Sequence, residues 1–190
     1  MNSLILSVLL SLSSTLEIDL PGDPARDFWN HLSSLCGQAF EGELITHPEG
    51  ETGFVNQRLV IHVRDCHEDW IRIPFSVGED RSRTWLLTRR EDRIELMHVH
   101  RHEDGTPDEV SMYGGQATNQ GRATAQYFPA DEQTRQVIEA AFSNVWVIEI
   151  EPEQTLSYGL WRLGTPRVFR IDFDLTRSVE PPPPPWGWID

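Results

Sequence analysis

The chain has 190 residues, a formal net charge of −14 at pH 7 and 38% hydrophobic residues, among them seven Trp and eight Phe. This length predicts one domain with a substantial core, and the aromatic content is typical of a folded globule and not of a disordered chain. The negative charge argues against binding to nucleic acid or to anionic membrane surfaces.

An apolar run, Leu4–Leu12, precedes the first charged residue, Glu17. A run of this length is typical of a secretory signal peptide and is too short for a stable membrane span. Ser11 and Ser13 offer small residues at the positions that signal peptidase reads. We therefore expect residues 1–14 to be a signal peptide and the protein to be periplasmic or secreted. The alternative is a buried N-terminal segment, because no Arg or Lys precedes the run.

A first helix is predicted over Arg26–Leu35, where Phe28 and Leu32 recur with helical spacing and Gly37 follows as a stop. Cys36 and Cys66 are the two cysteines. An even number in an exported chain favours a disulfide, here between the end of this helix and the turn after an early strand. Two separate buried thiols are the alternative.

Alternating polar and apolar residues then predict about ten short strands. The expected strands are Phe40–Leu44, Arg58–Arg64, Trp70–Val77, Arg83–Arg89, Arg93–Arg101, Val110–Tyr113, Arg122–Phe128, Val145–Glu151, Thr155–Arg162 and Arg167–Leu175. Pro74 favours an edge or a bulge in its strand, and Gly114-Gly115 is expected to end the strand before it. A second helix is predicted over Asp131–Phe142.

This pattern predicts a mainly β fold, a single antiparallel up-and-down β-barrel of about ten strands over residues 25–178, with a short N-terminal helix. A β-sandwich is the rival fold. The proline-rich tail, residues 179–190, holds five consecutive prolines and then Trp186-Gly187-Trp188, which predicts extended polyproline II. The tail either packs back on the barrel through its Trp side chains or contacts a protein partner.

Three histidines, His98, His100 and His102, follow Ile94 and Leu96 on one face of a predicted strand, because side chains alternate with period two. In a barrel we expect this row to project into the interior. Alternate residues lie about 6.5–7 Å apart along a strand, so neighbouring imidazoles could share a divalent metal ion. Further ligands could come from His62, Glu103, Asp104 and Asp108.

Arginines near strand ends predict a second kind of site. At a barrel mouth, Arg64 and Arg83 beside Trp85 would hold a carboxylate or phosphate group, whereas surface ion pairing is the alternative. The ligand-binding residues that we expect are Arg64, Arg83, Trp85, His98, His100, His102 and Tyr113. The chain has no nucleophile elbow, no phosphate-binding glycine loop, no dinucleotide fingerprint and no Cys-x-x-Cys pair, so we assign no catalytic residues.

Short motifs over most of the chain carry a resemblance. They are Trp29…Cys36-Gly37, Arg64-Asp65-Cys66, Ile71-Arg72-Ile73-Pro74-Phe75, Asp80-Arg81-Ser82-Arg83-Thr84-Trp85, Arg101-His102-Glu103-Asp104-Gly105, Tyr113-Gly114-Gly115 and Pro185-Trp186-Gly187. These motifs resemble an uncharacterised family of small exported bacterial proteins, which implies export and no particular activity. The order of helix, glycine and barrel resembles the calycin group of lipocalins, fatty-acid-binding proteins and nitrobindins. Nitrobindin-like barrels bind haem through a late His, and no His follows His102, which argues against haem.

We therefore expect an exported β-barrel that binds a small apolar or amphipathic ligand in its cavity, a role favoured over that of an enzyme. The alternative is a metal-dependent enzyme that uses the strand of His98, His100 and His102. Apart from a divalent metal, the sequence indicates no cofactor.

Overall fold

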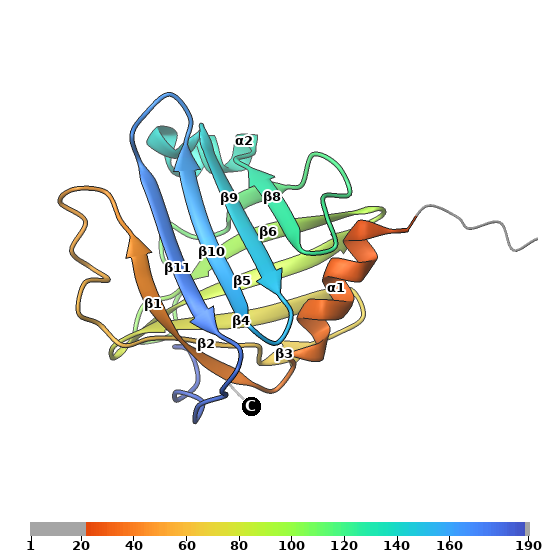
Figure 1. Ribbon diagram of the computed structural model, residues 1–190. Coiled ribbons are helices and arrows are strands. Elements are labelled where there is room, and N and C mark those ends of the chain that lie inside the picture. The colour runs from red at the N-terminus through yellow and green to blue at the C-terminus, as the bar shows by residue number, and fades with distance from the viewer. Residues whose placement is uncertain (1–21, 189–190) are drawn as a thin grey trace, which may run out of the picture.

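Strands make up most of the regular structure in the computed structural model, which describes residues 22–188 (Figure 1). The elements in chain order are α1 (Pro24–Ser34), β1 (Ala39–Thr46), β2 (Leu59–His62), β3 (Asp65–Cys66), β4 (Trp70–Val77), β5 (Asp80–Arg90), β6 (Arg93–His100), β7 (Tyr113–Gln116), β8 (Ala125–Pro129), α2 (Glu132–Val137), the 3₁₀ turn η1 (Glu139–Ala141), β9 (Asn144–Glu151), β10 (Thr155–Arg162) and β11 (Val168–Asp174). The predicted signal peptide lies outside the described residues.

The strands form one antiparallel sheet in the order β7-β6-β5-β4-β2-β1-β11-β10-β9-β8, with β3 paired to β4. Most strands that are consecutive in the chain are therefore neighbours, β7 and β8 being the main exception, and the first long strand meets the last, with Gly42 of β1 opposite Phe173 of β11. A Cβ at Gly42 would lie 2.5 Å from the Phe173 ring, so glycine lets these strands pair closely. The sheet curls into a nearly closed barrel, which confirms the predicted fold class (Figure 1).

A side chain closes the seam between the two ends of the sheet, β7 and β8. No strand ladder joins these two strands within residues 22–188. The buried Thr134 hydroxyl of α2 donates to the Gly114 carbonyl and accepts from the Gly114 amide, both at 2.7 Å. The Asp131 amide donates to the same carbonyl at 3.0 Å. A Cβ at Gly115 would lie 1.8 Å from the Pro129 carbonyl oxygen, so this glycine permits the close approach.

At this seam the structure corrects one predicted strand and shortens the predicted second helix, whose presence it confirms. The strand predicted over residues 110–113 runs over Tyr113–Gln116, so Gly114-Gly115 lies inside β7 and does not end it. The glycines serve close contact across the seam, which the local sequence does not distinguish from a turn. The second helix ends at Val137, because Ile138 is extended with φ −139° and ψ 87°, and a short 3₁₀ turn follows.

The α1 helix packs its apolar face into the core. Asp23 caps its first turn by accepting a hydrogen bond from the Arg26 amide at 3.0 Å, and Pro24 begins the helix with a suitable fixed φ. Phe28 and Leu32 are fully buried and belong to the same core cluster as the inward side chains of the barrel. The helix therefore fills one part of the interior, as its spacing predicts.

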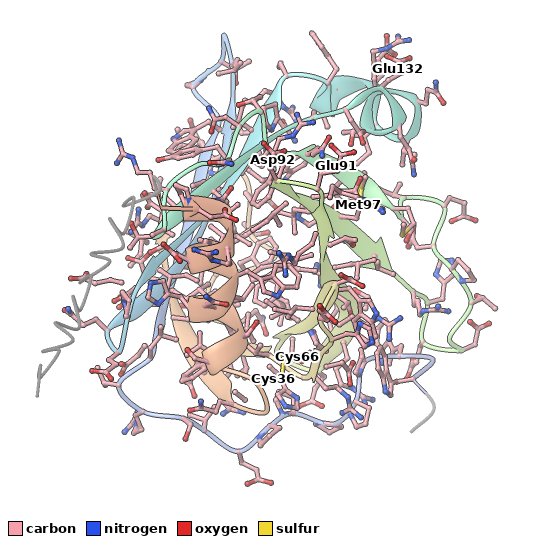
Figure 2. All side chains as sticks on the ribbon, turned by 90° about the vertical axis from the view of Figure 1, so that its right-hand side faces the viewer. Cys36, Cys66, Glu91, Asp92, Met97 and Glu132 are labelled. Carbon is pink, nitrogen blue, oxygen red and sulfur yellow. A yellow bond between two sulfur atoms is a disulfide. The ribbon has the colours of Figure 1, made fainter. Side chains whose placement is uncertain are left out.

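A disulfide joins Cys36, just after α1, to Cys66 of β3, and both lie at the foot of the helix in Figure 2. This confirms the predicted pair and excludes two free thiols. Pro74 lies within β4 where its pairing changes from β3 to β2, between the pairs of Arg72 and Phe75. The missing proline N–H therefore costs no ladder hydrogen bond on that side.

The C-terminal tail packs back over the outside of the barrel. The Val179 amide bonds to the Ala39 carbonyl at 2.8 Å, and the Arg81 guanidinium donates to the Pro184 carbonyl at 2.7 Å. Trp188 faces the Arg72 guanidinium at 5.1 Å from its ring centroid. This is the first of the two predicted arrangements for the tail. Of the helices in residues 22–188, none combines the length and the hydropathy that crossing a membrane requires.

Candidate ligand cavity

A cavity of about 220 Å³ lies inside the barrel, at the end where the segment that follows α2 contributes Ile138 and Ala141 to its lining. Figure 1 shows α2 at this end of the barrel. Its walls come from seven strands, from the β1–β2 loop and from the segment after α2. The lining residues are Glu51, Phe54, Phe75, Arg83, Trp85, His98, His100, Tyr113, Ile138, Ala141, Asn144, Trp146, Tyr158, Leu160, Arg162, Arg167 and Phe169. Aromatic, imidazole and guanidinium groups thus meet around one space.

A larger hollow of about 400 Å³ lies on the outer face, between the tail and β4–β6. Its walls include Leu86, Val99 and Trp186, side chains of the outward face of the sheet and of the tail. Its lining includes none of the histidines. The inner cavity is therefore the candidate site.

Aromatic rings form the apolar part of the inner cavity. Trp85, almost fully buried, stacks on Tyr158 with 4.3 Å between ring centroids and 19° between planes. Phe54, from the β1–β2 loop, stacks on Phe75 at 6.0 Å and contacts Phe169 at 4.9 Å. The loop therefore covers one side of the cavity and adds a ring to it.

His98 is the most buried polar side chain of the cavity, with 3% of its surface exposed. Its Nδ1 lies 3.0 Å from the Tyr113 carbonyl oxygen, which can only accept, so Nδ1 carries the proton. Its Nε2 then accepts from the Tyr158 hydroxyl at 2.7 Å. Burial lowers the pKa of His98 to about 3, against the opposing effect of the Tyr113 carbonyl. The imidazole is therefore neutral at physiological pH, and both ring nitrogens are in use.

His100 lies one step nearer the mouth, and its Nε2 is 3.2 Å from the Tyr113 hydroxyl. Burial and the Arg83 charge lower the pKa of His100 to about 4, which outweighs the opposite effect of Asp108 and Asp80. Burial also raises the pKa of Tyr113 to about 12. Both side chains are therefore neutral hydrogen-bonding groups at pH 7.

Three arginines give the mouth its charge. Arg83 forms an ion pair with Asp80, and Arg167 pairs through Nη2 with Glu51 at 3.0 Å. Arg162 donates from Nε to the Asn144 Oδ1 at 2.9 Å. Across residues 22–188, Arg162 forms no ion pair with a carboxylate. Burial and the neighbouring Arg167 charge both lower the pKa of Arg162.

Five of the seven predicted ligand-binding residues line this cavity. They are Arg83, Trp85, His98, His100 and Tyr113. Arg64 lies outside the barrel wall, where its guanidinium faces the Trp188 ring at 5.3 Å.

The three histidines predicted to bind a metal ion do not lie together in the structure. His98 and His100 face the cavity, but β6 ends at His100, and His102 lies half-exposed beyond it. His102 Nδ1 is 3.8 Å from Asp108, and its Nε2 is 3.7 Å from Glu109. These three side chains are the one group within the described part of the chain whose ligand atoms lie close enough for an ion. Because both nitrogens of His98 are hydrogen-bonded, a metal on the row would have to displace a partner of that ring.

Twelve of the seventeen lining residues were not predicted from the sequence. The missed polar residues are Glu51, Asn144, Tyr158, Arg162 and Arg167. Period-two alternation in the strand Thr155–Arg162 already places Tyr158, Leu160 and Arg162 on the same face as the core residue Leu156. That signal was sufficient to include them. Glu51 and Phe54 lie in a loop, where no such periodicity exists.

Comparisons of this chain with protein-family models, with curated proteins and with solved structures found no match. The fold and the cavity are therefore interpreted from this chain's own residues.

Proposed function

We propose that this protein binds a small amphipathic ligand in its barrel cavity. The observation that carries the proposal is the division of the cavity into an apolar part, made by Trp85, Phe75 and Phe169, and a polar part at the mouth, made by arginine, histidine and tyrosine. Ligand sites are concave and largely apolar, with a few polar groups that fix orientation. A ligand with an apolar body and one polar group matches both parts.

The volume limits the size of the ligand. A dry protein cavity of about 150 Å³ accepts benzene. A space of about 220 Å³ therefore accommodates a single ring with a short substituent, or a short aliphatic chain. Larger lipids require the walls to move.

The protonation states favour binding over catalysis. A general base works best when its pKa lies near the operating pH. The pKa values of about 3 for His98 and about 4 for His100 make both imidazoles weak bases. Their role in this proposal is to hold hydrogen bonds inside a low-dielectric space. The alternative of a metal-dependent enzyme draws no support from His98, whose nitrogens are engaged.

We also propose that the protein is exported, as the Cys36–Cys66 disulfide supports, because such bonds persist mainly in oxidising compartments. The predicted signal peptide supplies the route. A fusion of residues 1–25 to a reporter that functions only after export tests this, and a reporter retained in the cytoplasm would refute it.

Binding is tested by calorimetry with uncharged ligands of the expected size: benzyl alcohol, indole and 1-hexanol. Leu160→Trp fills the cavity from a lining position, whereas Leu163→Trp makes the same change at an exposed position outside it. We expect saturable binding of at least one ligand to the natural protein and to Leu163→Trp, and its loss in Leu160→Trp. Absence of binding by all three ligands, or equal binding by the two variants, would overturn the proposal.

A further inference from the structure

The mouth of the cavity holds a surplus of positive charge in a chain whose net charge is −14. Arg83 and Arg167 each have one carboxylate partner, Asp80 and Glu51. The nearest polar partner of Arg162 is the neutral amide oxygen of Asn144. An acidic protein has many carboxylates to offer, so one basic group left with a neutral partner inside a cavity calls for an explanation.

Arg162 and Arg167 are directly opposed across the β10–β11 hairpin. The Arg162 amide bonds to the Arg167 carbonyl at 3.1 Å, and the ladder of these strands continues from the adjacent pair, Trp161 and Val168. Like charges at directly opposed positions repel each other. Burial together with the Arg167 charge lowers the pKa of Arg162, which reports this repulsion. The two arginines thus occupy opposed positions of the hairpin, and their charges repel each other in the unliganded protein.

Arg167 also has unused donors. Its ion pair with Glu51 is made by Nη2, and its Nε is buried without a hydrogen-bond partner among the described residues. Buried donors without partners are rare in native proteins. An anion at this place would take up hydrogen bonds that the protein itself leaves open.

We infer that the cavity binds a small ring-containing carboxylate, with the ring against Trp85 and Tyr158 and the carboxylate between Arg162 and Arg167. This inference rests on the proposed function and adds the chemical class of the ligand. A carboxylate matches the planar fork of a guanidinium and forms short, charge-assisted hydrogen bonds with it. It would also relieve the repulsion between the two arginines. The aromatic wall lies deeper in the same cavity and receives the apolar end.

The test compares acids with alcohols of matched shape. Benzoate and phenylacetate are titrated into the protein by calorimetry, and their affinities are compared with those of benzyl alcohol and 2-phenylethanol. Hydrogen bonds to a charged group contribute about 1.5–3 kcal/mol, which corresponds to a preference of about ten- to a hundredfold for the acid over its alcohol. We expect this preference to decrease as salt is added, because partly exposed charges are screened.

Two variants assign the preference to Arg162. Arg162→Gln removes the charge, and Asn144→Asp supplies a carboxylate to Arg162 from within the protein with almost no change of shape. Both changes should bring the ratio of acid to alcohol affinity close to one. Arg90→Gln is the matched control, because Arg90 pairs with Glu95 near the β5–β6 turn and does not line the cavity.

The outcomes separate this inference from the proposed function. If alcohols bind and acids bind no tighter, the inference is wrong and the cavity proposal stands. If the acid preference survives in both Arg162→Gln and Asn144→Asp, the assigned residues are wrong. If neither class binds to the natural protein, both proposals fail.

Discussion

Acidification from about pH 8 to about pH 5 is expected to destabilise this protein through two buried imidazoles. The pKa of His98 falls from its ordinary value of 6.5 to about 3 in the folded protein, and that of His100 falls to about 4, in both cases chiefly because of burial. Below about pH 6.5 the unfolded chain therefore binds protons that the folded protein does not. Protonation favours the unfolded state, and stability is lost as the pH falls toward the folded pKa values.

The size of the effect at about pH 5 depends mainly on the pKa of the unfolded state. At about pH 5 the pH lies about 1.5 units below the ordinary pKa of an imidazole, so each of these histidines is protonated in the unfolded chain but still neutral in the folded protein. This difference lowers the unfolding free energy by about 2 kcal/mol per group. The two groups together contribute about 4 kcal/mol. A domain of this kind has a total stability of about 5–15 kcal/mol, so the loss is readily measured.

The assay is urea denaturation followed by circular dichroism across this pH range, for the natural protein and for His98→Gln. The variant loses its bond to Tyr158 and is less stable at every pH, so the quantity to compare is the change of unfolding free energy with pH. We expect that change to be about 2 kcal/mol smaller in His98→Gln, because one titrating group is gone. His47→Gln, at an exposed position in the β1–β2 loop, is the matched control.

Effects common to all three proteins cancel in this comparison. His62, whose pKa is lowered by burial and by Arg64, contributes in the same direction in each of them, and relief of the overall negative charge contributes equally. Parallel pH profiles for the natural protein and His98→Gln would refute the reasoning, because they would mean that His98 is protonated in the fold as easily as in the unfolded chain.

Three further predictions concern the parts that hold the barrel together. Replacing Cys36 and Cys66 by Ala should lower the unfolding free energy by about 3.6 kcal/mol, since the bond closes a loop with a sequence separation of 30 residues; a loss below about 1 kcal/mol in urea denaturation would contradict this. Thr134→Val leaves the Gly114 amide without its partner and should cost about 1–3 kcal/mol, whereas Thr134→Ser should stay near the natural value, and faster hydrogen exchange at that amide in Thr134→Val checks the cause. Trp188→Ala removes the ring beneath two guanidinium groups and should release the tail to carboxypeptidase, with a stability loss of about 1 kcal/mol; unchanged digestion would refute the contact.

The barrel could be predicted from the sequence because its strands obey period two. The predicted strand Thr155–Arg162 matches β10 residue for residue, and Glu91 and Asp92 form the turn between β5 and β6, within the gap left between the predicted strands Arg83–Arg89 and Arg93–Arg101 (Figure 2). Closure could be predicted only as a general expectation. Strand alternation reports which face is buried but does not report that β1 pairs with β11, which is set by contacts remote in sequence.

The candidate site was predicted only in part, because strand alternation places residues on the inward face but does not mark which of them belong to a site. The strand of His98 and His100 identified one wall through its unusual composition. The opposite wall is ordinary in sequence, and the bond between His98 and Tyr158 joins residues 60 positions apart. The sequence gives no sign that the three histidines of the row differ in surroundings. In the structure β6 ends at His100, and His102 lies beyond the strand, near Asp108 and Glu109.

If the cavity binds a ligand as proposed, the joint between β7 and β8 is the place where the barrel would open for a ligand that exceeds the cavity volume. Expansion at any other place would break a ladder of backbone bonds, whereas here the bonds described are the two of the Thr134 hydroxyl, the one from the Asp131 amide and the one from the Gln133 side chain to the Met112 carbonyl. Parting this joint costs a few kcal/mol, on the order of 1 kcal/mol for each bond lost. In a series of ligands of increasing chain length, the affinity should therefore stay constant up to a threshold length and then decrease by a fixed amount. The hydrogen bonds of Thr134 determine the size of that decrease.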